Sequence, residues 1–185
     1  MSEPRQLHTP KHDQTPAFKI AAAAIFAALV AAVTIVFIVP IPATSGYFNF
    51  GETIIYVAAL LLGPAVGAAA GAGAFIADML AGPAYAPGTF TIKAIEGFLV
   101  GYLTKALYKK TNNLTLSASV AVIIGGLEMV AGYFIYEQAF LGVPFLGALA
   151  EVPFNIVQMA VGLVIAVPVM FWVMRIFPQL RSYLQ

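Results

Sequence analysis

The chain consists of six long apolar runs separated by short segments that are polar or rich in proline and glycine. A helix that crosses a bilayer needs about 20 predominantly apolar residues, whereas the strands of a membrane barrel alternate between apolar and polar positions. Because these runs are continuous, the pattern predicts an all-α integral membrane protein, a bundle of six transmembrane helices. The predicted spans cover residues 18–39, 52–63, 65–81, 90–108, 116–136 and 145–174.

Prolines and glycines mark the ends of several spans. Pro40 and Pro42 follow the first run, and a proline lacks the backbone donor that a continuing helix needs. Gly63 and Pro64 predict a tight turn between the second and third spans. The sequence GPAYAPG at 82–88 predicts a loop before the fourth span.

Polar segments flank the membrane domain, which we predict to cover residues 18–178. Residues 1–17 are interpreted as a disordered cytoplasmic tail, and the two histidines within it, His8 and His12, as part of that tail rather than as metal ligands. Residues 179–185 are predicted to form a cytoplasmic C-terminal tail.

The basic residues predict the orientation of the bundle. Eight of the nine lie in three groups, near the two ends and in the middle of the chain. Because Lys and Arg are enriched in cytoplasmic loops, both termini and the middle connection are predicted to be cytoplasmic, and loops 40–51, 82–89 and 138–144 external. The groups are Arg5, Lys11 and Lys19; Lys105, Lys109 and Lys110; and Arg175 and Arg181.

Acidic side chains collect in the predicted outer half of the membrane, where Lys93 is the single base. Ionisable residues at such depth are costly and mark candidate functional sites. An excess of acids disfavours an anionic ligand and favours a neutral or cationic heterocycle that carries amino groups. These acids are Glu52, Asp78, Glu96, Glu137 and Glu151, and Glu128 lies nearer the middle of its span.

Composition excludes several classes of protein. With 61% hydrophobic and 9% charged residues, the chain differs from soluble domains, in which charged residues make up about 25%. The absence of cysteine excludes disulfides, thiolate metal sites and a cysteine nucleophile. The Gly-Ala-Gly-Ala string near residue 71 is not followed by Gly-Lys-Ser/Thr, so the chain lacks a phosphate-binding loop for ATP.

A polar stripe is predicted on the sixth span. Glu151, Asn155, Gln158 and Gly162 are spaced by four, three and four residues, which places them on one helix face. In a lipid-embedded helix such a stripe faces protein or a water-filled cavity. It either contacts a ligand or forms hydrogen bonds that hold the bundle together.

Further candidate ligand contacts lie around the first two external loops. Lys93 and Glu96 are one turn apart and are expected to pair with each other or with Asp78. Aromatic residues at this depth either form the interfacial belt or stack on a flat heterocycle. The candidates beside the acids are Asn49, Tyr85 and Tyr133.

Small residues predict close helix contacts on the first span. Ala24, Ala28 and Ala32 form one ridge along it, which another helix can approach closely.

Several motifs together resemble a known family. They are GYFNFGET (46–53), ALLLGPAVGAAAG (59–71), FIADML (75–80), YAPGTFTIKAIEGFLVGYL (85–103), EMVAGYF (128–134) and EVPFNIVQMAVG (151–162). In this order they resemble a substrate-binding S component of an energy-coupling factor (ECF) vitamin transporter, and most closely the hydroxymethylpyrimidine and riboflavin group. The likeness extends over nearly all of the chain after Ile20.

The resemblance implies a six-helix subunit in a prokaryotic plasma membrane that binds a vitamin near its extracellular side. The alanine ridge would dock onto a membrane coupling subunit that carries two cytoplasmic ATPases, and the first external loop would act as a gate. The chain itself would bind no cofactor, ATP would be used by the partner subunits, and no nucleic acid is expected as a partner.

The sequence thus predicts a transport subunit and not an enzyme. A hydroxymethylpyrimidine-like or thiamine-like ligand is the first choice and riboflavin the second. An autonomous carrier or channel is the alternative, and an intramembrane enzyme with paired carboxylates, such as Glu96 and Glu151, a remote one. The predicted ligand-binding residues are Asn49, Glu52, Tyr85, Lys93, Glu96, Glu128, Tyr133, Glu151, Asn155 and Gln158.

Overall fold

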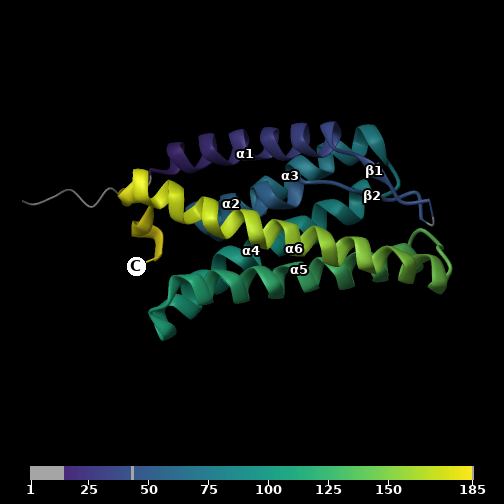
Figure 1. The fold of residues 1–185 in the computed structure, drawn as a ribbon. Helices are drawn as coiled ribbons and strands as arrows, with labels where there is room; N and C mark the ends of the chain where they lie inside the picture. Colours follow the sequence, from purple (N-terminus) through teal and green to yellow (C-terminus); the bar gives the residue numbers. More distant parts are fainter. Residues whose placement is uncertain (1–14, 43, 185) are drawn as a thin grey trace, which may run out of the picture.

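The computed structural model describes residues 15–42 and 44–184, which form an elongated bundle of helices (Figure 1). Six α-helices lie within these residues, as predicted, and a short hairpin and a 3-10 helix accompany them. In chain order the elements are α1 (Pro16–Val36), β1 (Val39–Pro40), β2 (Tyr47–Phe48), α2 (Gly51–Leu62), α3 (Pro64–Ala81), α4 (Ala86–Thr111), α5 (Leu114–Ala139), α6 (Phe145–Ile176) and the 3-10 helix η1 (Pro178–Leu184).

Four of the described helices, α1, α3, α5 and α6, are long and apolar enough to cross a membrane. Helix α2 has 12 residues, which is short for a complete crossing. Helix α4 has 26 residues but carries Lys93 and Glu96 inside the bundle and three lysines toward its end.

Helix α2 occupies the centre of the bundle. Every one of its residues except Ile54 is buried. A helix that is apolar on all sides and short enough to be covered by its neighbours belongs in the interior. It ends at Gly63, whose φ of 87° is the left-handed conformation that glycine adopts without strain. The predicted tight turn into α3 is therefore confirmed.

The C-terminal segment was predicted to be a tail. Its described residues, 179–184, instead pack against the turn at Gly63. They form η1, in which Leu184 is buried. The hydroxyl of Tyr183 donates to the carbonyl of Leu60, and its ring lies 3.3 Å from where a Cβ on Gly63 would be. Residues 1–14 of the predicted N-terminal tail lie outside the described residues.

Small residues allow the neighbouring helices to approach closely. A Cβ on Gly67 of α3 would lie 2.5 Å from the carbonyl oxygen of Gly97 on α4. On the other side of α3, Gly73 lies against the backbone of Ala27 in α1. Because any larger side chain at these glycines would separate the helices, α1, α3 and α4 form a tightly packed layer.

The segment between α1 and α2, predicted as a plain loop, folds back on itself as a hairpin. Its two strands are antiparallel, with Val39 opposite Phe48 and Pro40 opposite Tyr47. We call residues 39–50 the hairpin segment. It lies at the end of the bundle opposite η1 (Figure 1), and it places Tyr47 beside Asp78 of α3 and Asn49 beside Gln158 of α6.

Candidate functional site

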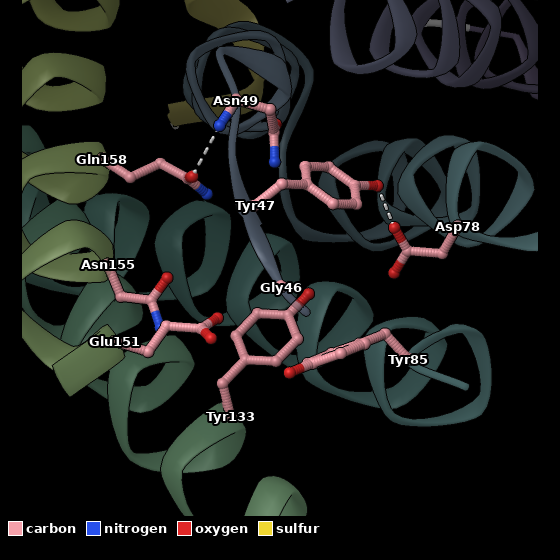
Figure 2. A pocket seen from close by; sticks show the side chains of 9 residues that line it. All are labelled: Gly46, Tyr47, Asn49, Asp78, Tyr85, Tyr133, Glu151, Asn155 and Gln158. Atoms are coloured by element: carbon pink, nitrogen blue, oxygen red, sulfur yellow. Dashed lines mark hydrogen bonds between the residues drawn. The ribbon is translucent and has the colours of Figure 1, made fainter. Parts of the chain in front are cut away.

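A small cavity lies beneath the hairpin segment, with a volume of about 30 Å³. Its walls come from α3, α5, α6 and Tyr85, the residue before α4, with the hairpin segment closing it (Figure 2). The side chains and backbone that line it are those of Gly46, Tyr47, Asn49, Asp78, Tyr85, Tyr133, Glu151, Asn155 and Gln158.

Six of the ten predicted ligand residues line this cavity. They come from four separate parts of the chain and are Asn49, Tyr85, Tyr133, Glu151, Asn155 and Gln158. Three further lining residues, Gly46, Tyr47 and Asp78, are absent from the predicted set. Sequence signals for two of them exist, because Tyr47 lies in the first predicted external loop and Asp78 near the outer end of the third span.

The predicted polar stripe of α6 forms one wall. Glu151, Asn155 and Gln158 are all buried, whereas Phe154 and Val157 on the other side of the helix are 43% and 52% exposed. The spacing of four and three residues therefore does bring the polar side chains to the same inward face.

Hydrogen bonds hold the hairpin segment against the cavity walls. The hydroxyl of Thr44 donates to Glu151 on α6, and the hydroxyl of Tyr47 donates to Asp78 on α3. The backbone N–H of Asn49 donates to Oε1 of Gln158 at 3.1 Å.

Two tyrosines at the cavity retain their protons as donors. Burial, reinforced by the adjacent Asp78 carboxylate, raises the pKa of Tyr47 above its usual range. Burial likewise raises the pKa of Tyr85, whose hydroxyl donates to the carbonyl of Thr44 at 3.1 Å. Both hydroxyls are therefore neutral near pH 7 and tie the hairpin segment to the helices.

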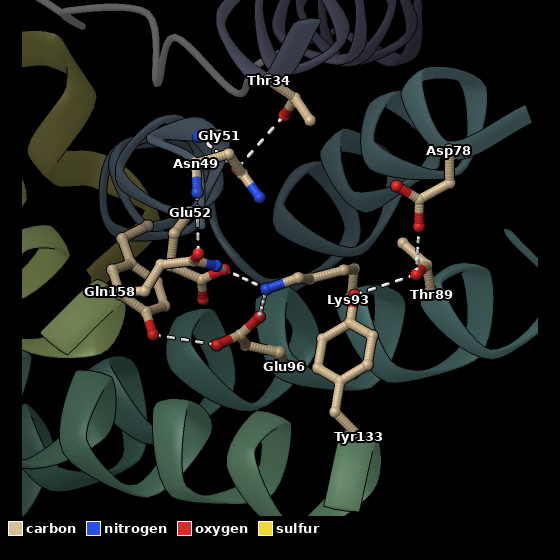
Figure 3. A network of polar contacts seen from close by, with 11 residues as sticks. Thr34, Asn49, Gly51, Glu52, Asp78, Thr89, Lys93, Glu96, Tyr133 and Gln158 are labelled. Atoms are coloured by element: carbon tan, nitrogen blue, oxygen red, sulfur yellow. Dashed lines mark hydrogen bonds and ion pairs between the residues drawn. The ribbon is translucent and has the colours of Figure 1, made fainter. Parts of the chain in front are cut away.

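A buried ion cluster adjoins the cavity (Figure 3). The ammonium of Lys93 contacts Glu52 and lies 3.2 Å from Oε2 of Glu96. Glu96 also accepts from the hydroxyl of Tyr56 at 2.8 Å. Gln158 connects this cluster to the cavity, because its Nε2 donates to Oε2 of Glu52 at 3.3 Å.

The pairing of Lys93 with Glu96 is thus confirmed, but the alternative pairing with Asp78 is wrong. Asp78 instead accepts from the hydroxyls of Tyr47 and Thr89. Lys93 is directed toward α2 because Glu52 offers a second carboxylate there. The cluster residues Glu52, Lys93 and Glu96 are not among those that line the cavity.

Glu128, also predicted as a ligand residue, lies away from the cavity lining. It is half-buried on α5, and its Oε2 atom has no hydrogen-bond partner among the described residues. No cluster of three or more His, Cys, Asp or Glu side chains that could hold a metal ion occurs within 15–42 and 44–184.

The alanine ridge of α1 faces outward. Ala24, Ala28 and Ala32 are exposed, whereas Val30 and Thr34 on the opposite face are buried against the bundle. Nothing in the described part of the chain covers the ridge, so bulk added there leaves the packing of the bundle unchanged.

Comparison with known proteins assigns this architecture to a family. The family model described as "ECF-type riboflavin transporter, S component" matches residues 16–175, which include the cavity and all six helices but for the last residue of α6. The chain belongs to this family of S components. The resemblance inferred from the sequence motifs is confirmed at this level, and with it the interpretation of the chain as a membrane transport subunit.

Two individual proteins are similar to this S component. A solved structure, described as that of the S component of a bacterial ECF transporter, superposes with a TM-score of 0.67 over 88% of this chain and 99% of the other at 17% identity. At that identity the likeness shows a shared fold. An uncharacterised protein of Pyrococcus woesei is 38% identical over 128 residues, which are 69% of this chain and 82% of the relative.

Proposed function

We propose that this S component captures a small, flat, neutral or cationic vitamin or vitamin precursor near the outer face of the membrane and delivers it inward. The observation that carries the proposal is the composition of the cavity. Asp78 and Glu151 supply carboxylates, three tyrosines supply aromatic faces, and none of its described lining residues is basic. Carboxylates accept from amino and ring N–H groups, and tyrosine rings stack on heterocycles.

Two ligands fit this description for different reasons. The carboxylates favour an aminopyrimidine of the hydroxymethylpyrimidine or thiamine kind, because a charge-assisted hydrogen bond to an amino group is about twice as strong as a neutral one. The description of the matching family favours riboflavin, which is neutral and carries a ring N–H and several hydroxyls. Both belong in the first binding experiments.

The membrane arrangement in this proposal has six spans, of which the short α2 crosses inside the bundle, covered by its neighbours, with both termini cytoplasmic, in the plasma membrane of a prokaryote. The positions of the basic residues support it, because Lys109 and Lys110 end α4 and Arg175 ends α6. The hairpin segment lies at the other end of the bundle (Figure 1). The cavity would then open toward the outside, where the vitamin is captured.

Transport in this proposal requires partners. A membrane coupling subunit docks on the ridge of Ala24, Ala28 and Ala32, and two cytoplasmic ATPase subunits supply the energy. The exposure of the ridge supports this assignment. The competing function, an autonomous carrier, differs in a simple observable, because such a carrier moves its solute across liposome membranes without any other protein.

The direct test is to identify what the purified protein binds. Mass spectrometry of ligand retained after mild detergent extraction, followed by titration of riboflavin, hydroxymethylpyrimidine and thiamine, should reveal one aromatic ligand with submicromolar to micromolar affinity. The same protein in liposomes should bind that ligand without accumulating it. Accumulation by the chain alone would establish the carrier instead, and selective binding of an anionic vitamin would refute the proposed ligand class.

Replacement of Asn155 by Leu should weaken binding of the retained ligand while the protein stays folded. Loss of one or two buried hydrogen bonds to a ligand costs about 1 to 3 kcal/mol, or about 5-fold to 150-fold in affinity. Calorimetry of the purified variant measures the change. Gln138→Leu is a suitable control, because its amide bonds only to Phe134 of its own helix among the described residues. Equal affinities of Asn155→Leu and wild type would place the stripe in bundle packing.

A further inference from the structure

The acceptors of the cavity are already occupied by the hairpin segment. Thr44 donates its hydroxyl to Glu151, and Tyr47 donates its hydroxyl to Asp78. Each bond joins a neutral hydroxyl of the segment to a carboxylate on a helix, and the two carboxylates lie on different walls (Figure 2). The segment thus makes the contacts that a ligand with hydroxyl or amino groups would make.

The backbone of the segment also occupies the space next to Glu151. A Cβ on Gly46 would lie 2.6 Å from both carboxylate oxygens, so the glycine backbone rests directly on the carboxylate. No ligand atom can reach Glu151 from this side while Gly46 stays in place.

Asn155 differs from its neighbours and points to a ligand. Its side chain is 5% exposed and lines the cavity, yet it forms no hydrogen bond with any described residue. Its amide atoms are not among the fully buried atoms that lack a partner, so they face the space of the cavity. The amide therefore is available for a molecule that enters the cavity.

The volume of the cavity requires the hairpin segment to move. A cavity of about 30 Å³ holds a single water molecule, whereas pockets for drug-sized ligands enclose about 300 to 1,000 Å³. The helices that form the walls pack against one another, α3 against α4, α4 against α5 and α5 against α6. The segment must therefore shift outward as a vitamin enters, and both hydroxyl bonds break in that step.

We propose that Asp78 and Glu151 are the acceptors that select the ligand, and that the hydroxyls of Tyr47 and Thr44 compete with the ligand for them. The ligand then carries donor groups, such as amino, ring N–H or hydroxyl groups, on two of its edges. This proposal rests on the proposed function, since it names the groups by which the same cavity recognises its vitamin.

If the hydroxyls compete with the ligand, removing a hydroxyl should raise ligand affinity and removing its carboxylate acceptor should lower it. Riboflavin and hydroxymethylpyrimidine serve as probes. Tyr47→Phe keeps the ring and removes the competing hydroxyl. Whichever of the two probes the wild type binds should therefore bind this variant about 3-fold to 30-fold more tightly. Asp78→Asn introduced into the Tyr47→Phe variant should then weaken binding about 10-fold or more, because the charged acceptor is lost; Thr89 donates to Oδ2 of Asp78, so the oxygen freed by Tyr47→Phe is Oδ1. Tyr136→Phe is the matched control, since that hydroxyl donates to the carbonyl of Ala84 and does not line the cavity.

The opposite sign overturns the proposal. If Tyr47→Phe weakens binding of the probe, the hydroxyl stabilises the bound state and does not compete with the ligand. If Asp78→Asn in the Tyr47→Phe background leaves affinity unchanged, Asp78 is not an acceptor for the ligand. Thr44→Val and Glu151→Gln provide a second, independent pair of variants should either of the first pair fail to fold.

A measurement without ligand separates this proposal from the proposed function. The chain contains no cysteine, so a single cysteine introduced by Asn155→Cys reports access to the cavity. Its rate of reaction with a small thiol reagent should rise about 3-fold to 30-fold when Tyr47→Phe is added, and stay constant when Tyr136→Phe is added. A higher rate combined with no binding of either probe by the chain that retains Asn155 would refute the proposed ligand class and leave the hydroxyl bonds established as the restraint on the segment. An unchanged rate would refute the restraint.

Discussion

Replacement of Ala28 by Trp should abolish uptake and leave ligand affinity close to that of the wild type. Ala28 lies at the centre of the outward face of α1, opposite the buried Val30 and Thr34. Helices that meet through small residues approach to about 8 Å, and an indole ring at the contact prevents this. Uptake is measured in cells that express the variant with its coupling and ATPase subunits, and affinity on the purified chain.

A second substitution shows whether the position or the bulk is responsible. Ala131 is also an exposed alanine, but it lies on α5, away from the ridge. Ala131→Trp adds the same side chain to the lipid-facing surface and should leave uptake normal. Normal uptake by Ala28→Trp, at the same expression level, would refute the docking assignment. Loss of ligand binding in Ala28→Trp would show instead that α1 is coupled to the cavity.

The helices could be predicted from the sequence because membrane helices are long and apolar. The predicted first span begins two residues after α1 does, at 18 rather than at Pro16. It was extended three residues too far, since the chain leaves helical geometry at Phe37 and enters β1. Apolar residues of similar hydropathy continue across that point, so composition does not mark it. The hairpin was missed because its strands have two residues each, which is too short for an alternating pattern to be recognised.

The cavity could be predicted where its residues share one helix. Glu151, Asn155 and Gln158 are found by their spacing alone. Tyr47 and Asp78 are 31 residues apart and lie on different elements, so their contact depends on how the elements pack. The pairing of Lys93 with Glu52, 41 residues apart, was missed for the same reason, whereas Glu96 at the i+3 position was found.

Glu128 shows a further limit of prediction. Counting residues along a span gives the depth of a side chain in the membrane, at about 1.5 Å per residue. It does not give the rotation of the helix about its axis, and the two acids of α5, Glu128 and Glu137, are nine residues apart and so form no stripe that defines an inward face. Tyr133 of the same helix lines the cavity, and Glu128 does not.

The largest effect on stability is expected for replacement of Lys93 by Met. The ammonium of Lys93 is buried between the carboxylates of Glu52 and Glu96, as Figure 3 shows. Removing one partner of a buried ion pair costs about 3 to 5 kcal/mol, because the remaining charge is left uncompensated. We therefore expect a large drop in the midpoint of thermal unfolding in detergent. Lys109→Met on the same helix removes an exposed lysine and should have little effect.

A double variant tests whether uncompensated charge is the cause. Glu52→Gln combined with Lys93→Met leaves one carboxylate in the cluster, that of Glu96, which still accepts from the hydroxyl of Tyr56 at 2.8 Å. The double variant should therefore be more stable than Lys93→Met alone, by about 1 to 3 kcal/mol. If instead the two losses of stability add, Lys93 stabilises the bundle through the packing of its carbon chain, and the ion cluster is not what holds α2 and α4 together.

Ligand binding by the double variant tests whether the ion cluster takes part in recognition of the ligand or only stabilises the fold. Lys93 and Glu52 adjoin the cavity without lining it, so affinity should stay within about tenfold of the wild type once the fold is restored.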